Sequence, residues 1–271
     1  MASRFEKDVP FAVYRSWDAL HFSRLKLMGK SPASYMANYR KGATALDMGR
    51  AIHVAVLEPD SWLDQYAIWE GGRRVGDEWE EFRDEHAGAE LISIEDATTC
   101  SAIARAVKLN PVAAEYFSEG EAEVSVKWDS RLGMPCKSRL DWVNPGLVLD
   151  LKSTRDASHR KFASQAASLS YHAQLAFYHD AAKAVDGLDR KCVIVAVEKV
   201  PPYEVGTYVV PDEAIRAGRL KYEGWMRGLV NHLASCKWPG VCPVETELYL
   251  PQYIFDEADE EELTLEGEIV T

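Results

Sequence analysis

Cysteine is scarce and scattered in this chain of 271 residues, which weighs against several kinds of metal centre. No CxxC pair occurs, so the sequence gives poor support to a zinc or iron–sulfur site. Cys136 and Cys192 fall in expected strands, where we interpret them as small core residues. The five cysteines are Cys100, Cys136, Cys192, Cys236 and Cys242.

Long apolar runs are also missing. No stretch approaches the ~18 consecutive apolar residues of a membrane helix, and no apolar run follows a basic start as in a signal peptide. We therefore expect a cytoplasmic protein with no membrane partner. There is no internal repeat and no long linker, and 47% of the residues are hydrophobic. Residues 1–255 are accordingly predicted to form one packed domain.

Positive charge is in deficit, since the net charge is −12. This argues at first against a nucleic-acid partner. Residues 256–268, however, contain eight acidic side chains and no basic one, and the rest of the chain carries only −4. We expect residues 256–271 to be an acidic, disordered tail. The charge is therefore weak evidence for or against nucleic acid.

Apolar spacing of three and four residues predicts helices in the first third of the chain and after the expected strands. Ser31–Pro32 marks a helix start, because proline is tolerated in a first turn, and Pro59 stops a later helix. Residues 60–90 are polar and contain Gly71-Gly72, so we expect a loop or insertion there. The expected helices cover residues 16–28, 44–57, 94–107, 171–185 and 212–234.

Alternation of apolar and polar residues from Glu121 onward predicts strands. In the second strand, Leu140 and Trp142 fall on one face and Asp141 on the other. Asn144-Pro145-Gly146 is a turn between the second and third strands. We expect a mixed sheet flanked by helices, an α/β or α+β domain. The expected strands cover residues 121–128, 135–143, 147–152, 193–197 and 205–210.

Two of these strands gather charge on one face. In the third strand, Asp150 and Lys152 share a face, and the short turn brings Asp141 alongside them. Carboxylates bind hard cations such as Mg²⁺, which activate water and hold a phosphate, and a lysine can stabilise the developing charge. The alternative is a solvent-facing strand edge with ordinary salt bridges. The Asp-x8-Asp-x-Lys pattern alone does not decide between them.

Two further patterns favour a metal-binding catalytic site over a solvent-facing strand edge. His53 lies in the middle of an apolar helix, where its ring is either a hydrogen-bonded core histidine or a ligand. Gln174 and Tyr178 are four residues apart and share a helix face, either at the edge of the core or beside the catalytic lysine.

Taken in order, these motifs resemble the RecB-like branch of the PD-(D/E)xK nucleases, and within it the C-terminal nuclease domain of RecE (exonuclease VIII). The likeness runs from about Tyr14 to Pro243. Each motif is weak alone, but four in the right order are fairly specific. They are Gly49-x-x-x-His53, Asp141, Asp150-Leu151-Lys152 and Gln174-x-x-x-Tyr178. Supporting details are Leu57-Glu58-Pro59, Lys137-x-Arg139-x-Asp141-Trp142, Asp150-Leu151-Lys152-Ser153-Thr154 and Trp238-Pro239-Gly240.

The resemblance implies a restriction-endonuclease-like core that uses Mg²⁺ or Mn²⁺, with one or two ions per site. The implied metal ligands are His53, Asp141, Asp150 and the Leu151 carbonyl, with Glu123 a further candidate. Lys152 would be the catalytic lysine, and Gln174 and Tyr178 would correspond to the family's Q-x-x-x-Y element. Several RecB-branch nucleases carry an iron–sulfur cluster on one early and three late cysteines. Here none precedes Cys100 and only two lie late, so we expect no cluster.

The resemblance also implies an ATP-independent exonuclease acting on double-stranded DNA ends from 5′ to 3′, which leaves 3′ single strands for an annealing protein. Because RecE-like proteins of this kind come from phages or prophages, it implies the cytoplasm of a bacterial or phage-infected cell. A homo-oligomeric ring, trimer or tetramer, would hold DNA despite the charge deficit. The alternatives are an endonuclease or single-strand-specific nuclease on the same fold, or an inactive module that binds DNA ends. The candidate DNA contacts are Lys137, Arg139, Ser153, Thr154 and Arg24, with Arg15, Lys26 and Lys30 facing the same channel.

Overall fold

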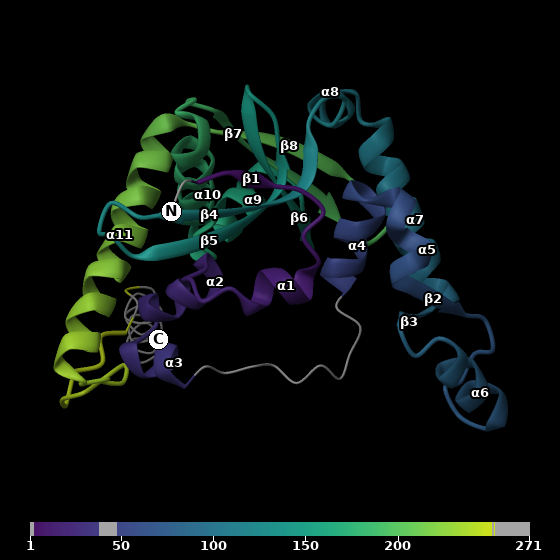
Figure 1. Ribbon diagram of the computed structural model, residues 1–271, viewed down its shortest axis with the longest axis horizontal. Helices are drawn as coiled ribbons and strands as arrows, with labels where there is room; N and C mark the ends of the chain where they lie inside the picture. The colour runs from purple at the N-terminus through teal and green to yellow at the C-terminus, as the bar shows by residue number, and fades with distance from the viewer. Residues whose placement is uncertain (1–2, 38–47, 251, 253–271) are drawn as a thin grey trace, which may run out of the picture.

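The centre of the molecule is a six-stranded mixed sheet (Figure 1). The computed structural model describes residues 3–37, 48–250 and 252. The strand order is β1-β4-β5-β6-β7-β8, in which only β6 and β7 run parallel. The expected tail at 256–271 lies outside the described residues. The strands are β1 (Phe5–Glu6), β4 (Glu121–Asp129), β5 (Pro135–Val143), β6 (Leu147–Thr154), β7 (Lys191–Glu198) and β8 (Val205–Val210).

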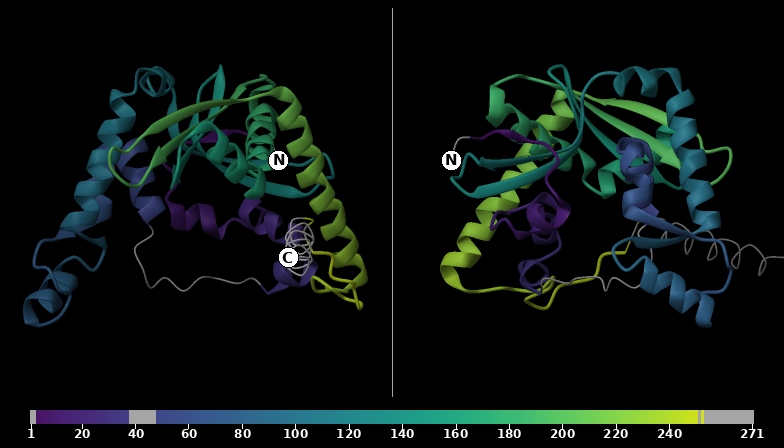
Figure 2. Two further views of the ribbon diagram at one scale, coloured as in Figure 1. Left: turned by 180° about the vertical axis from the view of Figure 1, so that it is seen from behind. Right: turned by 45° about the vertical axis from the view of Figure 1, so that its right-hand side comes forward.

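Helices cover both faces of this sheet, and two hydrophobic clusters fill the two interfaces. One cluster contains Phe177 and Met226, from α10 (Tyr171–Asp186) and α11 (Asp212–Ser235). The other contains Ile52 and Ile103, from α4 (Met48–Leu57) and α7 (Ile94–Leu109). Figures 1 and 2 show α11 and α7 standing at opposite sides of the sheet like the legs of an arch. The mixed sheet flanked by helices is thus confirmed.

The remaining helices are short. They are α1 (Phe11–Ser16), α2 (Phe22–Leu25), α3 (Pro32–Met36), α5 (Trp62–Gln65), α6 (Asp77–Glu85), α8 (Pro111–Tyr116) and α9 (His159–Ser168), with 3-10 turns at Lys26–Gly29 and Pro59–Ser61. Within the described residues, no helix is both long and apolar enough to cross a bilayer. Cys136 and Cys192 are buried in strands, as predicted.

The expected helix over residues 16–28 is wrong. The segment breaks between α1 and α2, where Leu20 forms a bridge with Cys136 of β5. Leu20 donates its N–H to Pro135 and accepts one from Lys137. These bonds hold Leu20 against β5, so tertiary pairing overrides a helical pattern. The Ser31–Pro32 start is confirmed, because the Ser31 hydroxyl caps α3.

The expected loop at 60–90 is also wrong. It contains α5, α6 and a two-stranded parallel sheet formed by β2 (Tyr66–Trp69) with β3 (Glu90–Ser93). Trp69 packs its ring against Trp79 and Phe82 of α6. Three aromatic residues therefore give this polar stretch a small core of its own. The helix expected over 44–57 is observed from Met48 to Leu57, and residues 44–47 lie outside the described part.

The strands over residues 121–210 are confirmed, but one face assignment is wrong. Leu140 belongs to the cluster under α10, whereas Trp142 packs in the opposite cluster. The simple alternation of β5 is therefore interrupted near Asp141. Strands β5 and β6 pair only through Trp142–Leu149 and Val143–Val148 and separate beyond that point.

The backbones of α10 and α11 are in close contact at Gly218. A Cβ atom built there would lie 2.2 Å from the carbonyl oxygen of His172 on α10. That contact is with backbone, which cannot rotate away. Gly224 is on the same helix, and a Cβ there would meet nothing closer than 4.0 Å.

We expect Gly218→Ala to lower the free energy of unfolding by about 1–3 kcal/mol, because α10 and α11 must separate. Gly224→Ala should be neutral or raise it by up to about 1 kcal/mol, through helix propensity alone. Urea denaturation followed by circular dichroism measures both. Equal effects of the two substitutions would contradict the close-packing argument.

Candidate metal centre

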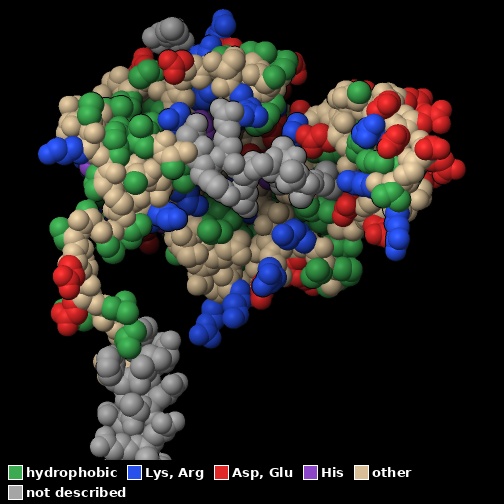
Figure 3. Space-filling view, turned by 90° about the horizontal axis from the view of Figure 1, so that it is seen from below, with side chains coloured by type: hydrophobic (Ala, Val, Ile, Leu, Met, Phe, Trp, Pro, Cys, Tyr) green, Lys and Arg blue, Asp and Glu red, His purple; other side chains and the backbone are tan. Residues whose placement is uncertain are grey.

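A cavity of about 1280 Å³ opens beneath the sheet between α1 and α4. Its lining includes His53, Glu123, Asp141 and Tyr178. Figure 3 looks at this side of the molecule and shows Lys and Arg side chains around its middle. Carboxylates and a histidine thus lie together in a hollow large enough for a polymeric ligand.

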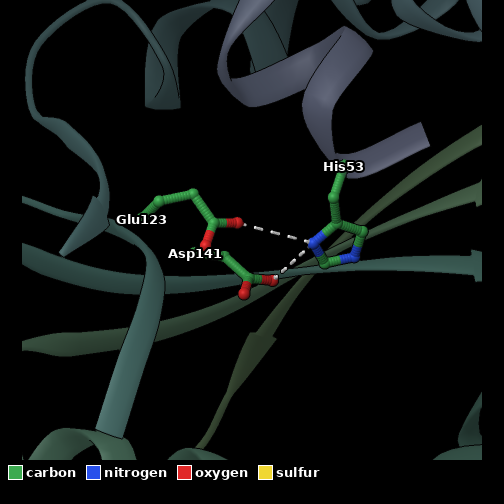
Figure 4. A group of neighbouring side chains, drawn as sticks. All are labelled: His53, Glu123 and Asp141. Carbon is green, nitrogen blue, oxygen red and sulfur yellow. Dashed lines mark ion pairs between the residues drawn. The ribbon is translucent and has the colours of Figure 1, made fainter. Parts of the chain in front are cut away.

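Three side chains meet in this cavity from three different elements (Figure 4). His53 lies on α4, Glu123 on β4 and Asp141 on β5. The Nδ1 atom of His53 is 3.7 Å from Asp141 Oδ2 and 4.0 Å from Glu123 Oε1. Each of the three residues offers a ligand atom within 4.8 Å of the others. Two ligands about 2.1 Å from one small cation would lie about 3–4 Å apart, so the spacing suits a shared ion.

Asp141 lies where the β5–β6 ladder ends. Its Oδ2 atom accepts the N–H of Leu151 at 2.8 Å, a bond that a backbone carbonyl would receive in a continued ladder. Glu123 stands opposite, between the ladder pairs Ala122–Trp142 and Val124–Leu140, and has a φ of 50°. A left-handed glutamate costs of order 1–3 kcal/mol, and such strain concentrates at functional sites. Both carboxylates therefore sit at irregularities of the sheet.

Asp150 lies beside this trio but is not one of its members. It is fully buried, and Lys152 Nζ lies 2.5 Å from its Oδ2. Neither Asp150 oxygen receives a well-oriented hydrogen bond from the described residues. A buried carboxylate without donors is costly unless a cation faces it. Beyond its ion pair with Lys152, Asp150 therefore has oxygen lone pairs left for a cation bound next to the trio.

The charges in the site perturb one another. Burial, with a contribution from Asp150, raises the pKa of Asp141 to about 7. Burial lowers the pKa of His53, but Asp141 and Glu123 outweigh this effect and bring it to about 9. For Lys152, Asp150 and Asp141 likewise outweigh burial and raise the pKa. The lysine remains charged and the carboxylates compete for cations, as expected of a site that binds metal.

The predicted Gln174–Tyr178 pair is present on α10. Gln174 Nε2 donates to the Tyr178 hydroxyl at 3.0 Å, and Tyr178 lines the cavity. Burial raises the pKa of Tyr178 well above its ordinary value, and the charges of Asp150 and Asp141 add to this. The pair therefore lies beside the acidic cluster, with the phenol kept protonated.

Two predicted DNA contacts have other partners. Lys137 is buried and donates to the carbonyls of Tyr14, Arg15 and Trp17 at 2.6–3.1 Å. An ammonium has three donors, and all three are used. Arg139 pairs with Glu123 and donates to the Val9 carbonyl. Both cations fix the N-terminal segment against β5, and both line the cavity, so their contacts with phosphate stay a prediction.

The other candidate DNA contacts differ in how far they are exposed and in whether they have partners within the protein. Thr154 is buried, and its hydroxyl donates a hydrogen bond to Gln165 Oε1 at 3.0 Å, a partner within the protein. Ser153 is half-buried.

Arg24 lines the cavity, with its guanidinium 4.7 Å from the centre of the Tyr35 ring. Lys26 donates to the Leu169 carbonyl, whereas Arg15 and Lys30 are exposed. Arg15 and Arg24 thus remain as cations facing the cavity.

Glu58 and Tyr14 also line the cavity, and the sequence patterns gave neither of them a role. Glu58 lies five residues after His53, and burial and the nearby Glu123 raise its pKa. The Leu57-Glu58-Pro59 motif had indicated this position. Tyr14 comes from α1, and its pKa is raised by burial. No motif in the sequence pointed to Tyr14, because the tertiary contact of α1 with β5 brings it to the cavity.

The residues fit a hard divalent cation. Carboxylate oxygens and one imidazole nitrogen suit Mg²⁺ or Mn²⁺. The oxygens of buried Asp150 receive no well-oriented hydrogen bond from the described residues, although Lys152 forms an ion pair with one of them. His53, Glu123 and Asp141 would hold the ion, with Asp150 next to them. Glu123 is thus more central, and Asp150 less so, than the motifs had suggested.

Comparison with known proteins agrees with this architecture. A family model described as a PDDEXK-like domain of unknown function, DUF3799, matches residues 21–246. The chain belongs to this family. A crystal structure described as a "Putative exonuclease" from Eubacterium rectale superposes with a TM-score of 0.61 at 13% identity, covering 91% of this chain and 96% of that one. That likeness shows the shared fold. No curated protein matches the sequence.

We expect Glu123→Gln and Asp141→Asn each to weaken Mn²⁺ binding at least about tenfold, because each removes a charged ligand. Titration followed by Mn²⁺ electron paramagnetic resonance measures the affinity. Glu95→Gln removes the same charge on the exposed start of α7 and should leave affinity unchanged. If the Glu123 variant bound like the Glu95 variant, Glu123 would not be a ligand.

Proposed function

We propose that this protein is a Mg²⁺-dependent, ATP-independent exonuclease that degrades double-stranded DNA from its ends, from 5′ to 3′. The observation that carries the proposal is the trio His53, Glu123 and Asp141 in one cavity, with the Asp150–Lys152 ion pair close to Asp141. Membership of a PDDEXK-like family supports hydrolysis of phosphodiesters. The Eubacterium rectale structure supports the exonuclease assignment by analogy of fold.

The chemistry would be attack of water on phosphorus with loss of one ester oxygen. A divalent ion bound at the carboxylates lowers the pKa of water and neutralises phosphate charge. Lys152, charged and paired with Asp150, would stabilise the negative charge that develops on the phosphate. The Tyr178 hydroxyl accepts a hydrogen bond from Gln174 Nε2, which fixes its position. Because the pKa of Tyr178 is raised, the hydroxyl keeps its proton and can donate it in a hydrogen bond inside the cavity.

Cleavage of an end-labelled linear duplex tests the proposal. Wild-type protein with Mg²⁺ should release label from 5′ ends before 3′ ends and spare closed-circular DNA. Lys152→Ala should lower the rate at least about a hundredfold, because a stabilising charge in the transition state is lost. Lys199→Ala, on an exposed lysine beyond β7, should cleave like wild type.

Three results would contradict the proposal in different ways. Cleavage without added metal would contradict a metal-dependent mechanism. Nicking of closed circles would favour an endonuclease. A Lys152→Ala variant as active as Lys199→Ala would mean that Lys152 is a structural cation.

We further propose a homo-oligomeric ring, trimer or tetramer, whose product passes to a strand-annealing protein. Enclosure would offset a net charge of −12, because DNA held inside a ring dissociates slowly without strong attraction. Light scattering coupled to size-exclusion chromatography should give three or four times the chain mass of 30.4 kDa. A monomer at working concentration would exclude the ring.

A further inference from the structure

Helix α1 carries aromatic side chains that do not belong to the core. None of its six residues is buried, and Phe11 is 44% exposed. Phe11 and Tyr14 lie stacked with ring centres 6.2 Å apart, and Trp17 meets Tyr14 edge-on at 5.5 Å. All three residues line the cavity that contains the metal centre. An aromatic row on one wall of a polar cavity has no explanation in folding.

Cations surround these rings. The guanidinium carbons of Arg15, Arg50 and Arg139 lie 5.4–5.9 Å from the centre of the Phe11 ring. The ammonium of Lys127 lies 4.0 Å from the centre of a Trp17 ring. Aromatic faces interleaved with arginine and lysine are the means by which proteins bind unpaired nucleic-acid strands, since bases stack on the rings while cations attract the backbone.

The wall is fixed in position relative to the metal centre. Lys137 binds three carbonyls at the end of α1, and Arg139 binds the Val9 carbonyl just before it. Arg139 also pairs with Glu123, one of the three candidate ligands. A single side chain therefore joins the Phe11 ring to the metal centre. A base stacked on this wall would belong to a nucleotide close to the reacting phosphate.

We propose that the Phe11–Tyr14–Trp17 wall stacks unpaired bases, so that the DNA strand to be cut enters the cavity single-stranded. This inference rests on the proposed nuclease function and specifies the form of its substrate. On a duplex, the terminal nucleotides must separate before the strand reaches the site. The duplex beyond them lies outside this wall.

Binding measured in a Lys152→Ala background tests the wall without cleavage. Fluorescence anisotropy would follow a labelled thymidine oligonucleotide and a blunt hairpin duplex. Phe11→Leu and Trp17→Leu should each weaken oligonucleotide binding at least about fivefold, because one stacking partner is lost. Duplex binding should change less than about twofold. Phe11→Trp, which keeps an aromatic face, should bind the oligonucleotide like the parent. Tyr249→Leu, on an exposed tyrosine outside the cavity, should change neither affinity.

An abasic oligonucleotide of the same length gives a second test that needs no altered protein. It carries the same phosphates without bases, so the parent should bind it at least about fivefold more weakly than the thymidine strand. Phe11→Leu should bind it as the parent does. Equal binding of the two strands by the parent, or equal losses on strand and duplex in Phe11→Leu, would overturn the inference. These binding results would leave the proposed nuclease function intact if the wild type cleaves DNA. Failure of the wild type to cleave DNA would instead refute the proposed function, whatever the binding results.

Discussion

The bond from Leu151 N–H to the Asp141 carboxylate is the interaction on which the site depends. It ends the β5–β6 ladder with a side chain, so the two strands separate without leaving that N–H unsatisfied. The edge of β5 that β6 has left is taken by Leu20, which brings α1 and α2 under the sheet. One carboxylate thus ends the strand pairing beside the cavity, belongs to the candidate metal-binding trio and leaves the edge of β5 free for Leu20.

Much of this arrangement could be predicted from the sequence, because it depends on local periodicity. The Asp150–Lys152 pair and the Gln174–Tyr178 pair follow from strand and helix spacing, and both are observed. Glu123 could have been ranked higher, since hairpin register places it opposite Asp141. Register, however, gives no indication that its backbone is left-handed.

What could not be predicted depends on contacts between segments distant in the sequence. Residues 16–28 have a helical pattern, yet Leu20 gains two backbone bonds to β5, and that gain breaks the helix. Lys137 and Arg139 were candidate phosphate contacts. Both donate to carbonyls more than a hundred residues earlier in the chain, and Arg139 also pairs with Glu123. No pattern of apolar spacing contains that information.

The anchoring of α1 has a consequence for how such proteins can diverge. Lys137 and Arg139 recognise carbonyl oxygens of the N-terminal segment, which every residue type possesses, and none of the six side chains of α1 is buried. Substitutions along this helix therefore leave its attachment and the core intact. The face that we propose to contact the DNA strand can therefore change, by natural selection or by engineering, while the candidate metal ligands behind it stay the same.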